Sequence, residues 1–491
     1  MQRIDPRRPV IVGAGQHTQR TNVGAEVLEP VVLFAHAIRA ALDDAGGSAP
    51  GHVGSVRLVR SLSALGYANA PLLAAQLAGV GADDYVVVDG GGETPGAALA
   101  RACDDIACGN RDSVVLVSGE AWFSRTRAQR SGGELACATQ AVDTPPPVHH
   151  GSMIEFVHLA ERALGIVRPI QEYPLFEQAL RVELGHTIAQ HQAHLGRFCS
   201  RLSAAAVTNP YAWDTMSHGE EEIATPSRIN RTVGFPYTKL MVSNEQVDMA
   251  AALVVMSTAH ADALGIMADR RIYPLAAASG VAPPISERYE LYDSVLVREV
   301  GRAIDELSNR KCRDAAHVDL YSCFPSAVQI QARELGLDVN GALSLTGGMR
   351  FGGGPWCGYA THGFAAMVNA LRNDPGSIGL VSANGGAITK LVVTLLSSEP
   401  SAAFTYASAQ PAIDASPRRA VLEGYSGSAI VESYTVMHGA GGQIENAIMA
   451  ALTPSGARAW AVVSDIDAAA AMTTDDAMGL SVTLRDGVAA F

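Results

Sequence analysis

The sequence has few charged residues and few aromatic residues. Of its 491 residues, 17% are charged and 6% are aromatic, whereas 48% are hydrophobic. The hydrophobic share excludes an intrinsically disordered chain, and the low charge excludes a coiled coil. A chain of this length and composition buries large hydrophobic cores, and its length favours about three domains.

Positive charge is scarce as well. The 36 Lys and Arg residues are outnumbered by 49 Asp and Glu residues, which gives a net charge of -13. Proteins that hold phosphate backbones carry a basic surface. We therefore expect no nucleic acid partner.

The seven cysteines are scattered and show no CxxC or CxxH spacing. This excludes a disulfide framework and a cysteine-based zinc site, and no other metal-ligand spacing occurs. The longest stretches without charged residues, 61–82 and 351–371, are broken by glycines and a proline, and no signal-peptide core follows the first residues. We expect a cytoplasmic protein without a membrane span and without a metal.

Short apolar runs alternate with amphipathic helical patterns in the first 120 residues. The predicted strands are residues 9–15, 56–59, 85–88 and 113–117, and the predicted helices are residues 31–45, 72–77 and 96–108. Apolar strands that alternate with helices are typical of a parallel sheet covered by helices on both faces. The fold class is therefore α/β.

The second half of the chain repeats this order at a nearly constant offset. Gly15 and Gly280 both end predicted strands and lie 265 positions apart, and Leu58 and Leu320 lie 262 positions apart. Several matches in near register, each with the same type of element, indicate an internal duplication. We predict two copies of one βαβαβαβ unit.

The repeat also predicts the domain organisation. Between the copies lies a segment with more proline and histidine and two predicted helices, at residues 154–164 and 175–194. After residue 400, short strands separated by turns predict a small all-β domain. The predicted units are the N-terminal half (1–121), an inserted loop domain (122–231), a return segment of the N-terminal half (232–262), the C-terminal half (263–400) and a β-barrel-like domain (405–491).

Three common nucleotide and hydrolase motifs are missing. Gly13-Ala-Gly15 follows a predicted strand, but Thr18 stands where a dinucleotide-binding loop has its third glycine. The sequence has no G-x-x-x-x-G-K-S/T loop and no G-x-S-x-G elbow. Dinucleotide binding, a P-loop and an ordinary α/β-hydrolase are therefore not expected.

Glycine-rich loops follow several predicted strands, where an open α/β sheet places its ligands. They contain the sequences GGETPG, DLYSCFPSAVQ, TGGMRFGGGPWCGYATHGFAAM and SANGGAITK. By these loops, and by the order of elements over residues 8–400, the chain resembles the thiolase superfamily. It is most similar to the mycobacterial thiolase-like proteins of type 1, which are classed with acetyl-CoA acetyltransferases.

The resemblance implies a five-layered αβαβα thiolase fold with an extra C-terminal OB-like domain. It also implies a coenzyme A thioester as substrate or ligand and no covalently bound cofactor. Thiolases use a nucleophilic cysteine, an activating histidine and a second cysteine. At the matching positions this chain has Glu93, Gly354 and Ala383, so the resemblance implies acyl-CoA handling with altered catalytic groups.

Three residues in or near these loops are the candidate catalytic groups. Cys323 lies two positions before Pro325, and proline often occupies the first turn of a helix. The Cys323 thiol could therefore lie at a helix N-terminus, or Cys323 could be a buried apolar cysteine. His362 could act as a general base or be a hydrogen-bonded core residue. Glu93 could be a carboxylate base or an anion at a helix N-terminus.

A second group of residues is predicted to bind the substrate. The Asn384 side chain, with the amides that follow it, could hold a thioester oxygen, although turn chemistry explains it equally well. In the family, the inserted region lies over the pantetheine arm of coenzyme A. The predicted binding residues are His150, Met153, Tyr321, Gly353, Gly354, Asn384 and Gly385.

Two functions remain open from the sequence. The first is an acyltransferase with rearranged catalytic groups. The second is a non-catalytic acyl-CoA binder, or a partner subunit whose C-terminal β domain docks another protein.

Overall fold

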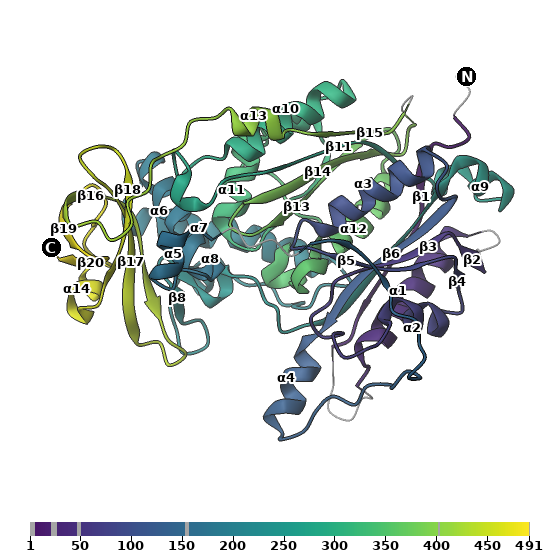
Figure 1. Cartoon of the computed structure of the whole chain (residues 1–491), viewed down its shortest axis with the longest axis horizontal. Helices are drawn as coiled ribbons and strands as arrows, with labels where there is room; N and C mark the ends of the chain where they lie inside the picture. Colours follow the sequence, from purple (N-terminus) through teal and green to yellow (C-terminus); the bar gives the residue numbers. More distant parts are fainter. Residues whose placement is uncertain (1–4, 21–26, 47–50, 153–156, 401–402, 491) are drawn as a thin grey trace.

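Two β-sheets with helices between and around them form the body of the protein, and a β-barrel lies at one end (Figure 1). The computed structural model describes residues 5–20, 27–46, 51–152, 157–400 and 403–490. Met153 lies outside these residues. Among the described residues, no helix combines the length and the apolarity that a bilayer span requires.

The sheet of the N-terminal half has the strand order β1-β10-β6-β3-β5-β7. Its central strands β6 and β10 are buried at every position, as expected where helices cover both faces. Strands β2 (His52–Val53) and β4 (Gly81–Ala82) form a small separate pair. The sheet strands are β1 (Pro9–Thr18), β3 (Ser55–Val59), β5 (Tyr85–Asp89), β6 (Ser113–Ala121), β7 (Val148–Gly151) and β10 (Asp248–Ser257).

The sheet of the C-terminal half has the order β12-β13-β14-β11-β15 and repeats that of the first half. Strands β11, β14, β13 and β12 take the places of β1, β10, β6 and β3, which confirms the duplication. The strands are β11 (Tyr273–Val281), β12 (His317–Asp319), β13 (Ile378–Gly385), β14 (Lys390–Ser397) and β15 (Thr405–Ser408).

The second copy differs from the first where β5 would be repeated. Of the described residues, none between α11 (Pro325–Glu334) and α12 (Tyr359–Asn373) forms a strand. Instead, the buried carboxylate of Asp319 accepts hydrogen bonds from the backbone N–H groups of Leu345 and Thr346, at 2.8 and 3.0 Å. This carboxylate holds the glycine-rich loop in an irregular conformation.

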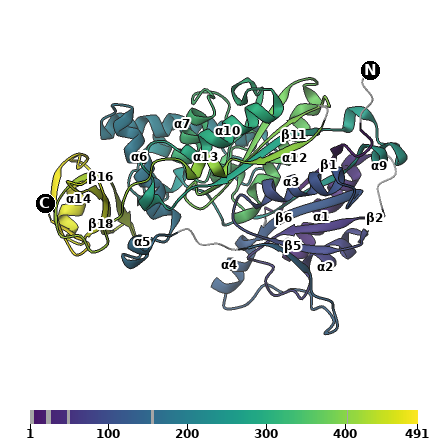
Figure 2. The same ribbon diagram turned by 45° about the horizontal axis from the view of Figure 1, so that its top comes forward.

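The helices complete an αβαβα arrangement. Helices α3 and α12 pack between the two sheets, α1 and α2 cover the outer face of the first sheet, and α10 and α11 cover the outer face of the second (Figures 1 and 2). The bounds of the helices in this part of the fold are α1 (Pro30–Ala45), α2 (Ala70–Ala78), α3 (Thr94–Ala107), α9 (Thr258–Ala263), α10 (Val295–Ser308) and α13 (Gln410–Asp414).

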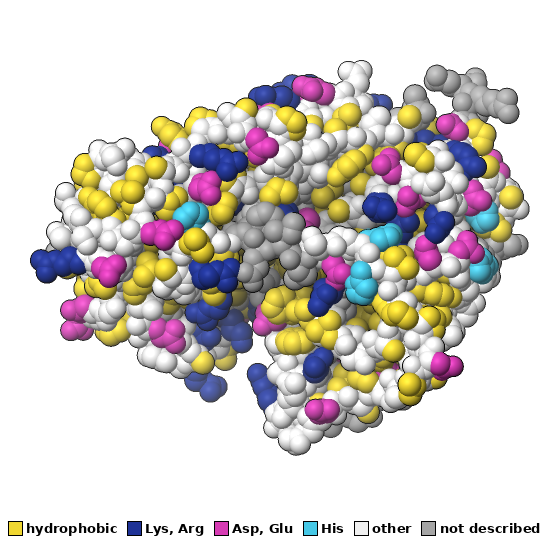
Figure 3. Space-filling model, in the orientation of Figure 1, with side chains coloured by type: hydrophobic (Ala, Val, Ile, Leu, Met, Phe, Trp, Pro, Cys, Tyr) yellow, Lys and Arg dark blue, Asp and Glu magenta, His cyan; other side chains and the backbone are white. Residues whose placement is uncertain are grey.

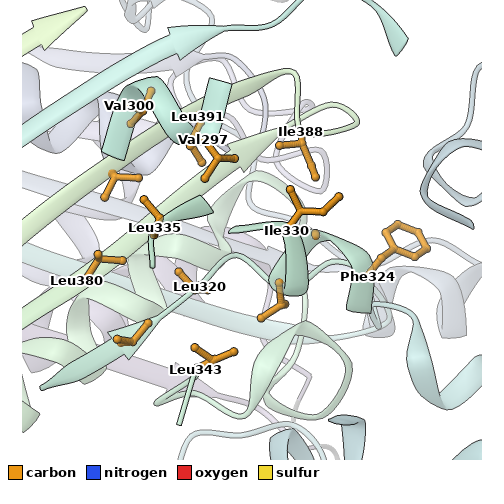
Figure 4. Packing of buried hydrophobic residues seen from close by; sticks show 14 of the residues in the cluster. Val297, Val300, Leu320, Phe324, Ile330, Leu335, Leu343, Leu380, Ile388 and Leu391 are labelled. Atoms are coloured by element: carbon orange, nitrogen blue, oxygen red, sulfur yellow. The ribbon is translucent and has the colours of Figure 1, made fainter. Parts of the chain in front are cut away.

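Apolar side chains of the second half fill the space between its sheet and its outer helices. In Figure 4, Val297 and Val300 of α10 point toward Leu391 of β14, and Ile330 lies beside Phe324 at the start of α11. Burial of one such side chain stabilises the fold by about 1.5–3 kcal/mol. This core fixes the ends of the strands, from which the functional loops extend.

The insertion is mainly helical. The single helix predicted for residues 175–194 is two helices, because Gly185 takes a positive φ of 68° and Thr187 caps the next helix through its side chain. The helices are α4 (Trp122–Arg130), α5 (Leu159–Ala163), α6 (Pro169–Glu183), α7 (Ile188–Thr208) and α8 (Glu220–Ala224).

The C-terminal domain is a closed barrel, as predicted. Strands β17, β18, β20, β19 and β16 pair in this order, and β16 also pairs with β17 to close the ring. Residues 232–238, which were predicted to return to the N-terminal half, form β8 and β9 and extend the barrel sheet. The elements are β8 (Thr232–Gly234), β9 (Tyr237–Thr238), β16 (Gly427–His438), β17 (Ile444–Leu452), β18 (Arg458–Val463), α14 (Ile466–Ala471), β19 (Ser481–Arg485) and β20 (Val488–Ala490).

Candidate active site

A cavity of about 710 Å³ lies where the loops of both halves meet the insertion and the C-terminal barrel. Strand ends of the second half contribute Tyr321, Cys323, Asn384 and Gly385 to its lining, and the glycine-rich loop contributes Gly354. The structure therefore brings five of the predicted site residues together. They come from separate loops, which the parallel arrangement of the strands places at one edge.

The hydroxyl of Tyr173, on α6 of the insertion, is the centre of the polar network at this cavity. It donates to the carbonyl of Gly386 at 2.7 Å and accepts from the Asn384 side-chain amide at 3.0 Å. It also lies within hydrogen-bond reach of the Cys323 thiol. Its ring stacks on Phe324 with centroids 4.4 Å apart, so the position of the phenol is fixed.

The thiols in this cavity hold their protons at neutral pH. Burial raises the pKa of Cys323 to about 12, and the nearby Tyr173 hydroxyl and Phe324 N–H offset this rise only in part. Burial likewise raises the pKa of Cys357, which also lines the cavity, to about 12. Burial raises the pKa of Tyr321 well above its usual value. A thiolate nucleophile is therefore not preformed.

The Asn384 side chain carries an unsatisfied acceptor. The residue is 1% exposed, and its amide nitrogen donates to Tyr173. Its side-chain oxygen is buried and, within the described residues, has no hydrogen-bond partner. Because such a buried acceptor costs about 1–3 kcal/mol when it is left unpaired, a ligand N–H or O–H that reaches it gains that energy.

The comparisons with known proteins agree with this geometry. A family model for the additional C-terminal domain of thiolase-like protein type 1 matches residues 408–487. The crystal structure of a monomeric SCP2-thiolase-like protein type 1 from Mycobacterium smegmatis matches with a TM-score of 0.84 and 28% identity, over 100% of both chains. The chain has the thiolase fold and the C-terminal domain of thiolase-like protein type 1.

Two more distant structures share the fold alone. An Ltp2–ChsH2(DUF35) aldolase has a TM-score of 0.58 and 22% identity, over 79% of this chain and 98% of its own. The dimeric peroxisomal thiolase of Saccharomyces cerevisiae has a TM-score of 0.58 and 12% identity, over 81% of this chain and 99% of its own. No curated protein sequence matches the chain significantly.

In this thiolase-like chain, the histidine predicted as a base lies outside the main cavity lining. His362 is 2% exposed on α12, and its Nδ1 is 2.8 Å from the side-chain oxygen of Gln16 on β1. Burial lowers the pKa of His362 to about 3. Its environment is that of a neutral core histidine.

Glu93 and His150 line a different cavity, of about 450 Å³. The Glu93 carboxylate lies just before α3 and pairs with Lys390 at 3.0 Å. His150 is half-buried on β7, and its pKa is lowered by burial and by the nearby Arg101. Neither side chain is part of the main cavity lining.

The glycines of the thiolase-like loops have different roles. Gly354 lines the main cavity, whereas Gly353 does not, and its φ of 106° places it where a side chain is strained. A Cβ at Gly353 would also collide with the sulfur of Met249. Gly353 therefore shapes the loop and Gly354 borders the ligand space.

Replacing Gly92 with alanine is expected to cost about 1–3 kcal/mol of stability and to narrow the cavity, because a Cβ there would collide with the carbonyl of Asn384 and the hydroxyl of Tyr321. Thermal unfolding measures the cost. Gly66→Ala is the control, since a Cβ at that position meets no atom within 4 Å. Equal stability of the two variants would contradict the close packing of Gly92 against Asn384 and Tyr321.

The sequence did not indicate several of the lining residues. Tyr173 lies within an ordinary helical pattern, and Cys357 lies in a glycine-rich loop in which other residues were taken as candidates. Arg231 and His438 come from the insertion and from the barrel, and only the pairing of β8 with β16 brings them together. Among the described residues, no three His, Cys, Asp or Glu side chains are arranged to hold a metal ion.

Proposed function

We propose that the protein binds a coenzyme A thioester in the main cavity without forming a covalent acyl-enzyme. The cavity volume of about 710 Å³ lies within the range of small-molecule sites, about 300–1,000 Å³. Ile170, Val233, Phe324 and Met349 supply apolar lining that suits an acyl chain and a pantetheine arm. The thiolase fold supports this class of ligand.

One observation carries the proposal: Asn384 offers a hydrogen-bonding group to the cavity, and the two thiols that line the cavity keep their protons. Asn384 offers a buried oxygen without a partner, which matches an amide N–H of a pantetheine arm. The thiols of Cys323 and Cys357 have pKa values of about 12, and the Cys357 thiol donates to the carbonyl of Gly90 at 3.5 Å. The site therefore suits recognition better than nucleophilic attack.

A second candidate, acyl transfer to Cys323, is favoured by one feature. The thiol lies in the cavity just before α11, near the N–H of Phe324. In that reaction, the sulfur of Cys323 would bond to the acyl carbon, the bond to the coenzyme A sulfur would break, and the thiol proton would pass to the leaving sulfur. Docking of a partner protein through the C-terminal domain stays a prediction.

Calorimetry and intact-mass measurement with acetyl-CoA test both candidates. We expect saturable binding and no added acetyl mass after incubation at pH 7.5. Cys323→Ser is expected to keep the binding, and Cys137→Ser, which changes an exposed cysteine, is the matched control. An adduct that disappears only in Cys323→Ser would establish acyl transfer, and absence of binding to the wild-type protein would refute both candidates.

A further inference from the structure

The C-terminal barrel forms part of the wall of the main cavity. Met437 and His438, at the end of β16, line it together with Gly439, Ala440 and Glu445 from the connection to β17 and its start. The barrel is therefore more than an appended module, because the cavity is incomplete without this hairpin.

Hydrogen bonds join β16, the first strand of this hairpin, to the segment between β8 and β9 and to the insertion. The N–H of Phe235 donates to the carbonyl of Val436 at 2.9 Å, and the hydroxyl of Thr435 donates to the carbonyl of Phe235 at 2.9 Å. The hydroxyl of Ser433 donates to the carbonyl of Leu175, on α6, at 2.6 Å. Since these bonds are buried, the hairpin is a fixed wall.

The turn of the hairpin is closed by its own backbone. Gly439 N–H donates to the carbonyl of Gln443 at 2.9 Å, and Gly442 N–H donates to the carbonyl of Gly439 at 3.0 Å. The turn therefore holds its shape beside the cavity without a ligand.

Arg231 and His438 both line the cavity beside this hairpin. The pairing of Met437 with Gly234 brings Arg231 close enough to His438 to lower its pKa, after the larger effect of burial. Nδ1 of His438 donates to the carbonyl oxygen of Val436 at 3.1 Å, so in the neutral ring Nε2 is a hydrogen-bond acceptor available to a ligand.

Two arginines, Arg168 and Arg231, line the cavity. Among the described residues, neither Arg168 nor Arg231 forms an ion pair, although Glu245 and Glu445 also line the cavity. On the face drawn in Figure 3, Lys and Arg side chains gather on the side of the C-terminal domain, next to the hollow that separates it from the N-terminal half.

We propose that the β16–β17 hairpin is part of the ligand site, that Arg231 contacts the phosphate groups of a coenzyme A thioester, and that Nε2 of His438 accepts a hydrogen bond from a hydroxyl or amino group of the same end of the ligand. This inference rests on the proposed function. A guanidinium is a good partner for phosphate oxygens, because Arg binds such oxygens with two parallel hydrogen bonds. The pantetheine arm then extends toward Asn384, which lines the same cavity.

Calorimetry with acetyl-CoA and with acetyl-pantetheine, which lacks the phosphates, separates the two ends of the ligand. Arg231→Glu is expected to weaken acetyl-CoA binding at least about tenfold and to change acetyl-pantetheine binding by less than about threefold. His438→Ala is expected to weaken acetyl-CoA binding by about three- to tenfold. Arg231→Gln gives a smaller loss in the same direction and shows the effect without charge reversal.

Arg228→Glu is the matched control, because this exposed arginine lies three positions from Arg231 and is not part of the lining. Binding of inorganic pyrophosphate provides a separate readout of the phosphate site. The inference fails if acetyl-CoA binds no more tightly than acetyl-pantetheine, or if Arg231→Glu and Arg228→Glu have equal effects. If the wild-type protein binds pyrophosphate through Arg231 but neither thioester, the proposed function fails and the anion site stands.

Discussion

Replacing Arg458 with methionine is expected to lower the free energy of unfolding by about 3–5 kcal/mol. The side chain is 0% exposed and donates to the carbonyls of Ile285, Ser286 and Arg288 at 2.9, 2.9 and 2.6 Å. It also pairs with Glu432, with Nε 2.6 Å from Oε2. The variant leaves a half-buried carboxylate and three backbone acceptors without their donor.

The size of this effect follows from the position of Arg458. It lies on β18 of the barrel, whereas the three carbonyls belong to the C-terminal thiolase half, so one guanidinium joins the two domains. The indole N–H of Trp460, on the same strand, donates to the Ser286 hydroxyl at 2.7 Å. A urea titration of the variant and of the wild-type protein, followed by circular dichroism, measures the loss of stability.

Arg418→Met is the control for this experiment. Arg418 is 43% exposed and pairs with Glu287 at 3.0 Å, and an exposed pair of this kind contributes about 0–1 kcal/mol. If Arg458→Met shifts the urea midpoint no further than Arg418→Met, the buried arginine does not anchor the barrel. Because the barrel forms a cavity wall, Arg458→Met should also weaken binding of acetyl-CoA.

The sequence pattern predicted most of the fold because local periodicity determines most of its elements. Residues 85–88 and 113–117 were predicted as strands and lie within β5 and β6. The pattern missed β7 (Val148–Gly151), whose sequence VHHG has no strand periodicity. This strand forms because the edge of β5 offers it hydrogen-bonding partners, and such a tertiary effect leaves no local signal.

The candidate site was predictable only where strand ends supply it. Tyr321 and Cys323 follow β12, and Asn384 lies at the end of β13 in the same sheet, so their convergence follows from α/β topology. Tyr173 and His438 lie in the insertion and in the barrel, and they reach the cavity through contacts between domains. No spacing in the sequence encodes those contacts.

His362 shows the limit of reasoning from one helix. The sequence left two roles open for His362, a general base or a hydrogen-bonded core residue. Helix α12 lies between the two sheets, and the His362 ring meets Gln16 of β1. A helix with neighbours on all sides offers no solvent-facing direction that the sequence could reveal.

His362→Gln is expected to make the protein less sensitive to acid. Burial lowers the pKa of His362 to about 3 in the folded protein, whereas the ordinary value is 6.5. Below pH 6.5 the unfolded chain therefore binds a proton that the folded chain does not, and stability falls as the pH falls toward 3. The loss is about 1.4 kcal/mol per pH unit, or about 2.7 kcal/mol between pH 6.5 and pH 4.5.

Glutamine suits this test because its amide N–H can still donate to the Gln16 side-chain oxygen while the side chain cannot be protonated. At pH 7.5 the variant is expected to be less stable by about 1–3 kcal/mol, because its shape fits the buried site less well. Urea titrations at several pH values should then show this deficit shrinking by about 2.7 kcal/mol between pH 6.5 and pH 4.5. His52→Gln, which removes an exposed histidine beside Asp83, is the control. A deficit that stays constant with pH would mean that His362 takes up a proton in the folded state, and that the site around it admits charge.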